Sequence, residues 1–105
     1  MRTRQRAMKR RSMSVTSDLR RLVFVRDGWR CMAPVLDPNA DACRDRWGSI
    51  EAKDLTVDHV KDAARLGVRA PSDTAHLVTL CHYHNGNGWA SAHRALERAY
   101  LRSLT

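Results

Sequence analysis

The chain has little of what a membrane-spanning, secreted or disulfide-bonded protein needs. None of its apolar runs approaches the roughly 20 residues that cross a bilayer, and no apolar signal-peptide segment follows its N-terminal charges. Its three cysteines are an odd number, which does not fit a complete disulfide framework. Aromatic residues are scarce, with one Phe, three Trp and two Tyr. We therefore expect a small cytoplasmic domain whose core needs support beyond hydrophobic burial.

Acidic residues are outnumbered by basic ones. The 105 residues include 11 Asp and Glu against 19 Lys and Arg, a formal net charge of +8. The N-terminal stretch MRTRQRAMKRR has six Arg or Lys, no acidic residue and no apolar periodicity. We predict a flexible basic arm over residues 1–15 and one folded domain over 16–105. The charge favours an anionic partner, and an arm without an apolar stripe favours nucleic acid over a membrane surface.

Short helical and extended patterns alternate along the folded part, which indicates an α+β fold. TSDLRRLVFVRDG predicts a helix that Thr16 or Ser17 caps and Gly28 ends. Apolar, β-branched runs predict strands over 55–60 and 76–81. The final stretch 91–104 predicts an amphipathic helix, whose apolar face comprises Ala92, Ala95, Leu96, Ala99 and Tyr100. The core is expected to include three tryptophans, Trp29, Trp47 and Trp89.

Cysteine and histidine spacing predicts a structural zinc site. Cys81 and His84 form a C-x-x-H pair at the end of the second predicted strand, a span that lets one tight turn direct both side chains at an ion. Cys31 and Cys43 lie upstream, with eleven residues between them. Three thiolates and one imidazole form a known tetrahedral zinc set, and the ion would supply folding energy to a small core. His82 competes as the fourth ligand, and the alternative is cysteines packed as small apolar groups.

Further polar residues lie at the ends of the two predicted strands. LTVDHV places Asp58 beside His59, and HLVTLCHYHN ends in histidines and an Asn. A carboxylate and a histidine can hold a hard cation and a base near one water, as phosphodiester hydrolysis requires. The order R-D-G-x-R-C, D-H-V, H-L-V-T-L-C-x-x-H and then GWASAHRALERAYL resembles the HNH endonuclease family over residues 17–102. The small zinc-bearing members found in phage genomes are the most similar in this order.

The resemblance implies a small zinc-stapled ββα-metal (HNH, or His-Me finger) fold with a flanking N-terminal helix. It implies that His59 is the general base and that Asp58 holds a catalytic divalent ion, Mg²⁺ or Mn²⁺ and alternatively Ni²⁺ or Zn²⁺. His76 stands where the family usually has Asn, so it would orient His59 through a hydrogen bond. Asn85 stands at the third motif position as a catalytic residue and metal ligand, and His93 is an alternative ligand.

The resemblance also implies a function. We expect a metal-dependent DNA endonuclease of low sequence specificity, which nicks one strand or cuts both during phage DNA processing or packaging. Phosphate contacts are expected from Arg10, Arg11, Arg65, Arg69, Arg94 and Arg98. The terminase large subunit is a further candidate partner, and the oligomeric state stays open. The alternative function is a noncatalytic, zinc-stapled DNA-binding accessory module of a packaging terminase.

Overall fold

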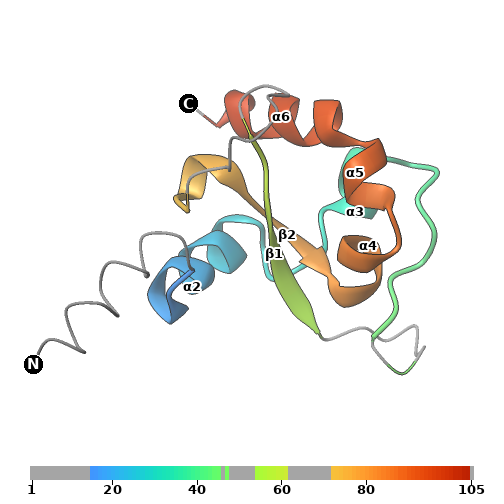
Figure 1. Cartoon of the computed structure of the whole chain (residues 1–105), viewed down its shortest axis with the longest axis horizontal. Helices are drawn as coiled ribbons and strands as arrows, with labels where there is room; N and C mark the ends of the chain where they lie inside the picture. The colour runs from blue at the N-terminus through green and yellow to red at the C-terminus, as the bar shows by residue number, and fades with distance from the viewer. Residues whose placement is uncertain (1–14, 46, 48–53, 62–71, 105) are drawn as a thin grey trace, which may run out of the picture.

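The computed structural model describes residues 15–45, 47, 54–61 and 72–104. In these ranges the chain is a two-stranded antiparallel sheet with helices on both sides, which confirms the predicted mixed α+β class (Figure 1). The predicted basic arm lies outside the described residues except for Val15. The elements in chain order are α2 (Ser17–Arg26), α3 (Ala33–Leu36), β1 (Leu55–His59), the 3-10 helix η1 (Thr74–His76), β2 (Leu77–Cys81), α4 (His82–Gly86), α5 (Trp89–Ala92) and α6 (Arg94–Ser103).

The hairpin of β1 and β2 forms the centre of the fold. Its antiparallel register places Leu55 opposite Cys81 and His59 opposite Leu77. All residues of β2 are buried, since helices pack on both faces of this strand. In Figure 1, α2 lies on one side of the hairpin, and α3, α4 and α5 lie on the other. The core cluster comprises Cys31, Met32, Ala33, Val60, Val78, Leu80, Cys81, Trp89, Ala90 and Leu101.

Helix α2 begins and ends as the sequence predicts. The Thr16 hydroxyl accepts a hydrogen bond from the Leu19 amide at 3.1 Å, which caps the first turn. The helix is followed by Gly28 at φ +76°, a backbone conformation that favours glycine. Val23 and Phe24 are its buried residues, and they fix the side of α2 that faces the hairpin.

A buried carboxylate joins α2 to the rest of the fold. Asp27 is 2% exposed and accepts hydrogen bonds from the Arg26 guanidinium at 2.8 and 2.9 Å, and from the Thr79 amide at 2.9 Å. The Tyr100 hydroxyl of α6 also donates to it. One carboxylate therefore links α2, β2 and α6, with hydrogen-bond donors at both of its oxygens.

The C-terminal helix differs from its prediction in two ways. It is interrupted at His93, so that α5 and α6 are separate helices. The predicted apolar face is wrong, because Leu96 is 39% exposed while Glu97 and Leu101 are buried. Glu97 can occupy the inner face because Arg94 lies one turn before it and donates to its carboxylate. The buried side of α6 is therefore formed by Glu97 and Leu101 rather than by a row of alanines.

The tryptophans also divide differently from the prediction. Trp89 is buried at 7% exposed, whereas Trp29 and Trp47 are 56% and 84% exposed, so the core prediction is wrong for these two. Trp29 has a φ of 56° immediately after Gly28, and it contacts the Phe24 ring at a centroid distance of 5.5 Å. The turn thus directs the indole outward. No helix in the described part of the chain combines the length and apolarity that crossing a membrane requires.

Candidate functional site

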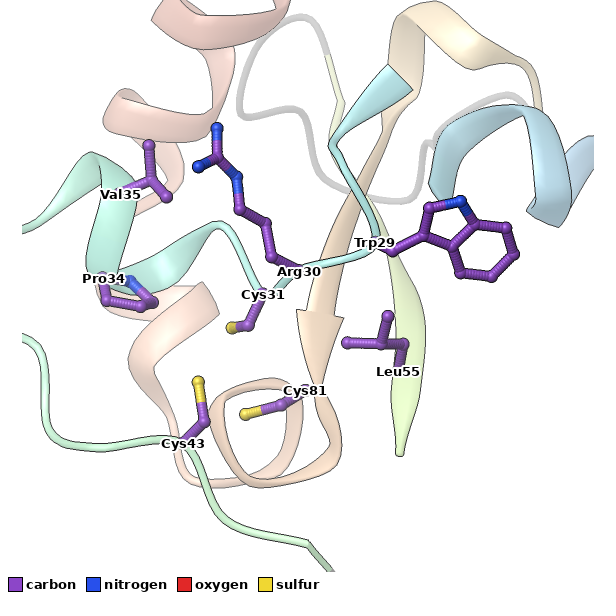
Figure 2. Close-up of a pocket in the computed structure, with 8 residues that line it drawn as sticks. All are labelled: Trp29, Arg30, Cys31, Pro34, Val35, Cys43, Leu55 and Cys81. Carbon is purple, nitrogen blue, oxygen red and sulfur yellow. The ribbon is translucent and has the colours of Figure 1, made fainter. Parts of the chain in front are cut away.

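Three cysteines and one histidine converge where the loops meet the hairpin. The Nδ1 atom of His84 lies 3.2 Å from the Sγ of Cys81, 3.5 Å from that of Cys31 and 3.7 Å from that of Cys43. The four ligand atoms all lie within 4.8 Å of one another, so they could hold a metal ion. Figure 2 shows the three sulfurs directed at a common point from three separate segments. The predicted convergence of these four residues is confirmed.

Local structure explains why Cys81 and His84 face one ion. Cys81 is the last residue of β2 and the N-cap of α4, and its sulfur accepts a hydrogen bond from the His84 amide at 3.3 Å. One helical turn therefore carries His84 back over Cys81. The rings of Tyr83 and Trp89 contact the imidazole edge-on, with centroids at 5.1 and 6.0 Å. The competing ligand His82 is exposed and is not in the cluster.

The thiols perturb one another strongly. A hydrogen bond with Cys31 lowers the pKa of Cys81 to about 4. The same hydrogen bond, together with burial, raises the pKa of Cys31, and burial raises that of Cys43. A thiolate at Cys81 is therefore already favoured, and a cation at the centre would favour the other two by the same attraction.

The cluster opens on a pocket of about 540 Å³. The three cysteines line its floor, and Figure 2 shows Trp29, Arg30 and Leu55 around it. Pro34 and Val35 of α3 also line the pocket.

His59 and Asp58 lie at the end of β1 but have different surroundings. The Nε2 of His59 lies 3.1 Å from the Ser72 hydroxyl, and its side chain is half-buried. Asp58 is 7% exposed and accepts a hydrogen bond from Arg94 of α6. Successive strand residues point to opposite faces. The two side chains are adjacent in sequence, and their hydrogen bonds lead to different partners.

Asn85 lies close to β1. Its Nδ2 atom donates to the Thr56 hydroxyl at 2.8 Å and to the Val57 carbonyl at 3.4 Å. These bonds tie α4 to the strand that carries Asp58 and His59. They use only the amide nitrogen of Asn85, while its amide oxygen is the atom that binds metals.

The two remaining candidate histidines make other contacts. The Nδ1 of His76 lies 2.7 Å from the Asp73 carboxylate. The ring of His93 stacks on Trp89 with centroids 4.6 Å apart, and its nitrogens lie 2.8 Å from the Trp89 carbonyl and 3.4 Å from the Asp37 carboxylate. The contacts of His93 therefore join it to α5 and to Asp37, whereas those of Asn85 join it to β1.

Glu97 was not predicted from the sequence as a site residue. It is fully buried, its Oε1 accepts from the Nη1 of Arg94 at 2.9 Å, and its Oε2 is buried without a hydrogen-bond partner. Burial, followed by the nearby Asp58 carboxylate, raises the pKa of Glu97 to about 9. The available sequence signal was its spacing from Arg94 and Leu101, three and four residues away, which places all three on one side of a helix.

The candidate phosphate contacts are only partly described. Arg94 is engaged with the Asp58 and Glu97 carboxylates, and the Nε of Arg98 donates to the Lys61 carbonyl at 2.9 Å. Arg10, Arg11, Arg65 and Arg69 lie outside the described residues. Arg94 and Arg98 of α6 therefore make contacts within the protein while remaining partly exposed to solvent.

Comparison with known proteins identifies no relative: no family model, no curated protein and no solved structure matches the chain.

Proposed function

We propose that the chain is a metal-dependent DNA endonuclease of the HNH type, built on a structural zinc ion. One arrangement supports this proposal above the others. His59 ends β1, the hairpin leads into α4, and Asn85 of α4 hydrogen-bonds back to β1. This is the order of strand, strand and helix that the resemblance implies, with its first and third motif positions on neighbouring elements.

Zinc fits the cluster of cysteines and histidine by geometry and by donor type. With Zn–S near 2.3 Å and Zn–N near 2.1 Å, tetrahedral angles place nitrogen and sulfur about 3.6 Å apart. The distances from His84 Nδ1 to the three sulfurs, 3.2, 3.5 and 3.7 Å, lie around that value. Four protein ligands complete the coordination and leave no position for substrate, so the role is structural.

The hydrolytic step is assigned to the end of β1. His59, with its ring held by the Ser72 hydroxyl, takes a proton from water as the water oxygen bonds to phosphorus. The bond from phosphorus to the leaving oxygen breaks in the same displacement. A divalent cation held by Asp58 and the amide oxygen of Asn85 would stabilise the charge on that leaving oxygen. Mg²⁺ or Mn²⁺ suits these oxygen donors, and a nitrogen ligand such as His93 would also admit Ni²⁺ or Zn²⁺.

Electrostatic attraction would hold the DNA. The formal charge of +8 favours contact with phosphates. Phosphate contacts carry no sequence information. The affinity that they supply falls as the salt concentration rises, because binding releases counterions from the DNA. Among the residues that the structure describes, Arg98 on α6 is a candidate for such a contact. Because phosphate contacts do not read the bases, we expect low sequence specificity. A place in phage DNA processing or packaging beside a terminase rests on the resemblance alone.

A noncatalytic DNA-binding module is the second candidate. Two observations favour it: Arg94 already neutralises Asp58, and the His93 ring nitrogens contact Asp37 and the Trp89 carbonyl. A site of this kind would bind DNA through its charge and never cut it. Both candidates predict salt-sensitive DNA affinity, so cleavage must decide between them.

Plasmid nicking by zinc-loaded protein tests the proposal. The native chain, His59→Ala and the matched control His82→Ala are compared with Mg²⁺ and with Mn²⁺, after each variant is shown to be folded and to contain zinc. We expect nicking by the native chain and the control, and a loss of at least about a hundredfold in His59→Ala, since general bases contribute on that scale. Equal nicking by all three proteins would contradict the assignment of the base. Binding without nicking by the native chain would favour the noncatalytic module.

A further inference from the structure

One nitrogen of Arg94 lies between two buried carboxylates. Its Nη1 donates to the Oδ2 of Asp58 on β1 and to the Oε1 of Glu97 on α6, the latter at 2.9 Å. The side chains of Asp58 and Glu97 are 9% and 0% exposed, whereas that of Arg94 is 32% exposed. A positive charge thus lies between two carboxyl groups, on a side chain that is itself partly exposed.

The second observation concerns Glu97 alone. Its Oε2 is buried and has no hydrogen-bond partner, which is a costly state for a polar oxygen. A guanidinium carries one charge and can neutralise only one of two carboxylates, so Glu97, whose pKa is raised to about 9, keeps its proton at neutral pH. A divalent cation that displaces this proton neutralises both groups, and it can bind either or both oxygens of a carboxylate. The pair is therefore more completely satisfied by such a cation than by Arg94.

We propose that Asp58 and Glu97 together form a divalent-cation site, and that the Arg94 guanidinium occupies the cation's position and competes with it. The inference rests on the proposed function in one respect, since Asp58 is also the ligand proposed there. It adds Glu97 as a ligand and gives Arg94 a defined part. Binding of the cation releases the guanidinium, which can turn outward because a third of the side chain is already exposed. A released Arg94 is then free for a DNA phosphate.

The affinity for Mn²⁺ tests the competition directly. Free Mn²⁺ is measured by electron paramagnetic resonance in titrations of zinc-loaded protein, without DNA. Arg94→Gln removes the competitor, and we expect it to bind Mn²⁺ about tenfold more tightly or better, because a unit charge at contact distance has been removed. Glu97→Gln keeps the shape but cannot lose a proton to become a charged ligand, and we expect about tenfold weaker binding because that negative charge is missing beside the bound ion. Arg98→Gln removes an equal charge one turn along α6 and corrects the Arg94→Gln result for general electrostatics.

Two results would overturn the inference: an Arg94→Gln affinity no higher than that of Arg98→Gln, or a Glu97→Gln affinity equal to that of the native chain. If Arg94→Gln fails to fold, the native chain still gives an answer. The Arg94 Nε–H resonance, assigned by its absence in Arg94→Lys, should move toward the position of a solvent-exposed arginine as Mg²⁺ is added. A resonance that stays in place while Mg²⁺ saturates the protein overturns the inference.

The outcomes also separate this inference from the proposed function. Nicking that depends on His59, with unchanged Mn²⁺ affinity in Glu97→Gln, supports the endonuclease and overturns the Asp58–Glu97 site. Competition between Arg94 and Mn²⁺, without nicking under any metal, supports the site and overturns the endonuclease.

Discussion

Two clusters of ionisable side chains join the hairpin to its surroundings, and they are completed in different ways. Cys31, Cys43, Cys81 and His84 bring four metal-ligating atoms within 4.8 Å of one another. Asp58, Arg94 and Glu97 form an ionic cluster that already contains a cation of the protein. Thiols and an imidazole that converge need an external ion to balance the thiolate charge. The ionic cluster already has an arginine between its two carboxyl groups, so it can form without an external ion.

Each cluster nevertheless has one buried polar atom without a partner. In the metal-ligating cluster it is His84 Nε2, and in the ionic cluster it is Glu97 Oε2. The first lies on the far side of an imidazole whose Nδ1 faces the sulfurs. The second belongs to a group that could itself bind a cation. Arg94 therefore balances the charge of one carboxylate, while burial and the nearby Asp58 raise the pKa of Glu97 to about 9 and keep it protonated.

Removal of zinc is expected to have the largest effect, because it breaks the cluster that depends on an external ion. The apparent binding energy of structural zinc is on the order of 10 kcal/mol, comparable to the stability of a small domain. A strong chelator should therefore unfold the chain, with loss of the far-ultraviolet circular dichroism signal and recovery on adding zinc. Cys81→Ser should unfold it as well. Retained helix signal after complete zinc removal would contradict a structural role.

Arg94→Met should have the next largest effect, because it removes the cation of the ionic cluster. Breaking a buried ion pair from one side costs about 3–5 kcal/mol, since the remaining charge on Asp58 stays buried. Urea unfolding of zinc-loaded protein measures the change, with Arg98→Met as the control. Adding Asp58→Asn to Arg94→Met should recover part of the loss. Mn²⁺ should also recover part of it, because a ligand of the folded state stabilises that state. A cost below about 1 kcal/mol would place this pair with ordinary surface salt bridges.

Asp27→Asn is expected to have the smallest of these effects, and it sharpens the contrast with Glu97. Burial acts to raise the pKa of Asp27, but donors from Arg26, Tyr100 and Thr79 outweigh it and lower the pKa below 3.8. We expect Asp27→Asn to cost about 1.5–3 kcal/mol at neutral pH, as for hydrogen bonds to a charged group. The control is Asp18→Asn, an exposed position in the first turn of α2.

The pH dependence of Asp27→Asn follows from the sign of that shift. As pH falls, the unfolded chain binds a proton at Asp27 before the folded chain does, which favours unfolding. The stabilisation is complete above the ordinary aspartate pKa and is lost as pH falls through the lowered folded value. The difference in unfolding free energy between native and variant should therefore shrink on acidification, and comparison in the same zinc-containing buffer cancels acid effects on the metal ligands. A constant difference would show that Asp27 does not titrate in this way.

Local signals in the sequence were reliable where a single turn or strand carried the information. Thr16 and Gly28 bound α2 as predicted, and the strand prediction over 55–60 differs from β1 by one residue. The C-x-x-H spacing sufficed for Cys81 and His84, because one helical turn brings them together. Cys31 and Cys43 were found by residue type, since thiols in a polar loop are otherwise hard to explain.

By itself, therefore, the sequence determined the mixed α+β order of elements and the four candidate metal ligands, because caps, strand patterns and ligand spacing act over a few residues. The tertiary structure alone decided the break at His93, the outward position of Trp29 and the meeting of Asp58 with Arg94 and Glu97. The position of Trp29 follows from the turn at Gly28 and Trp29. The meeting of Asp58 with Arg94 and Glu97 depends on which side of α6 faces the sheet, and the ion pair between Arg94 and Asp58 of β1 joins residues too far apart in the chain for local spacing to predict.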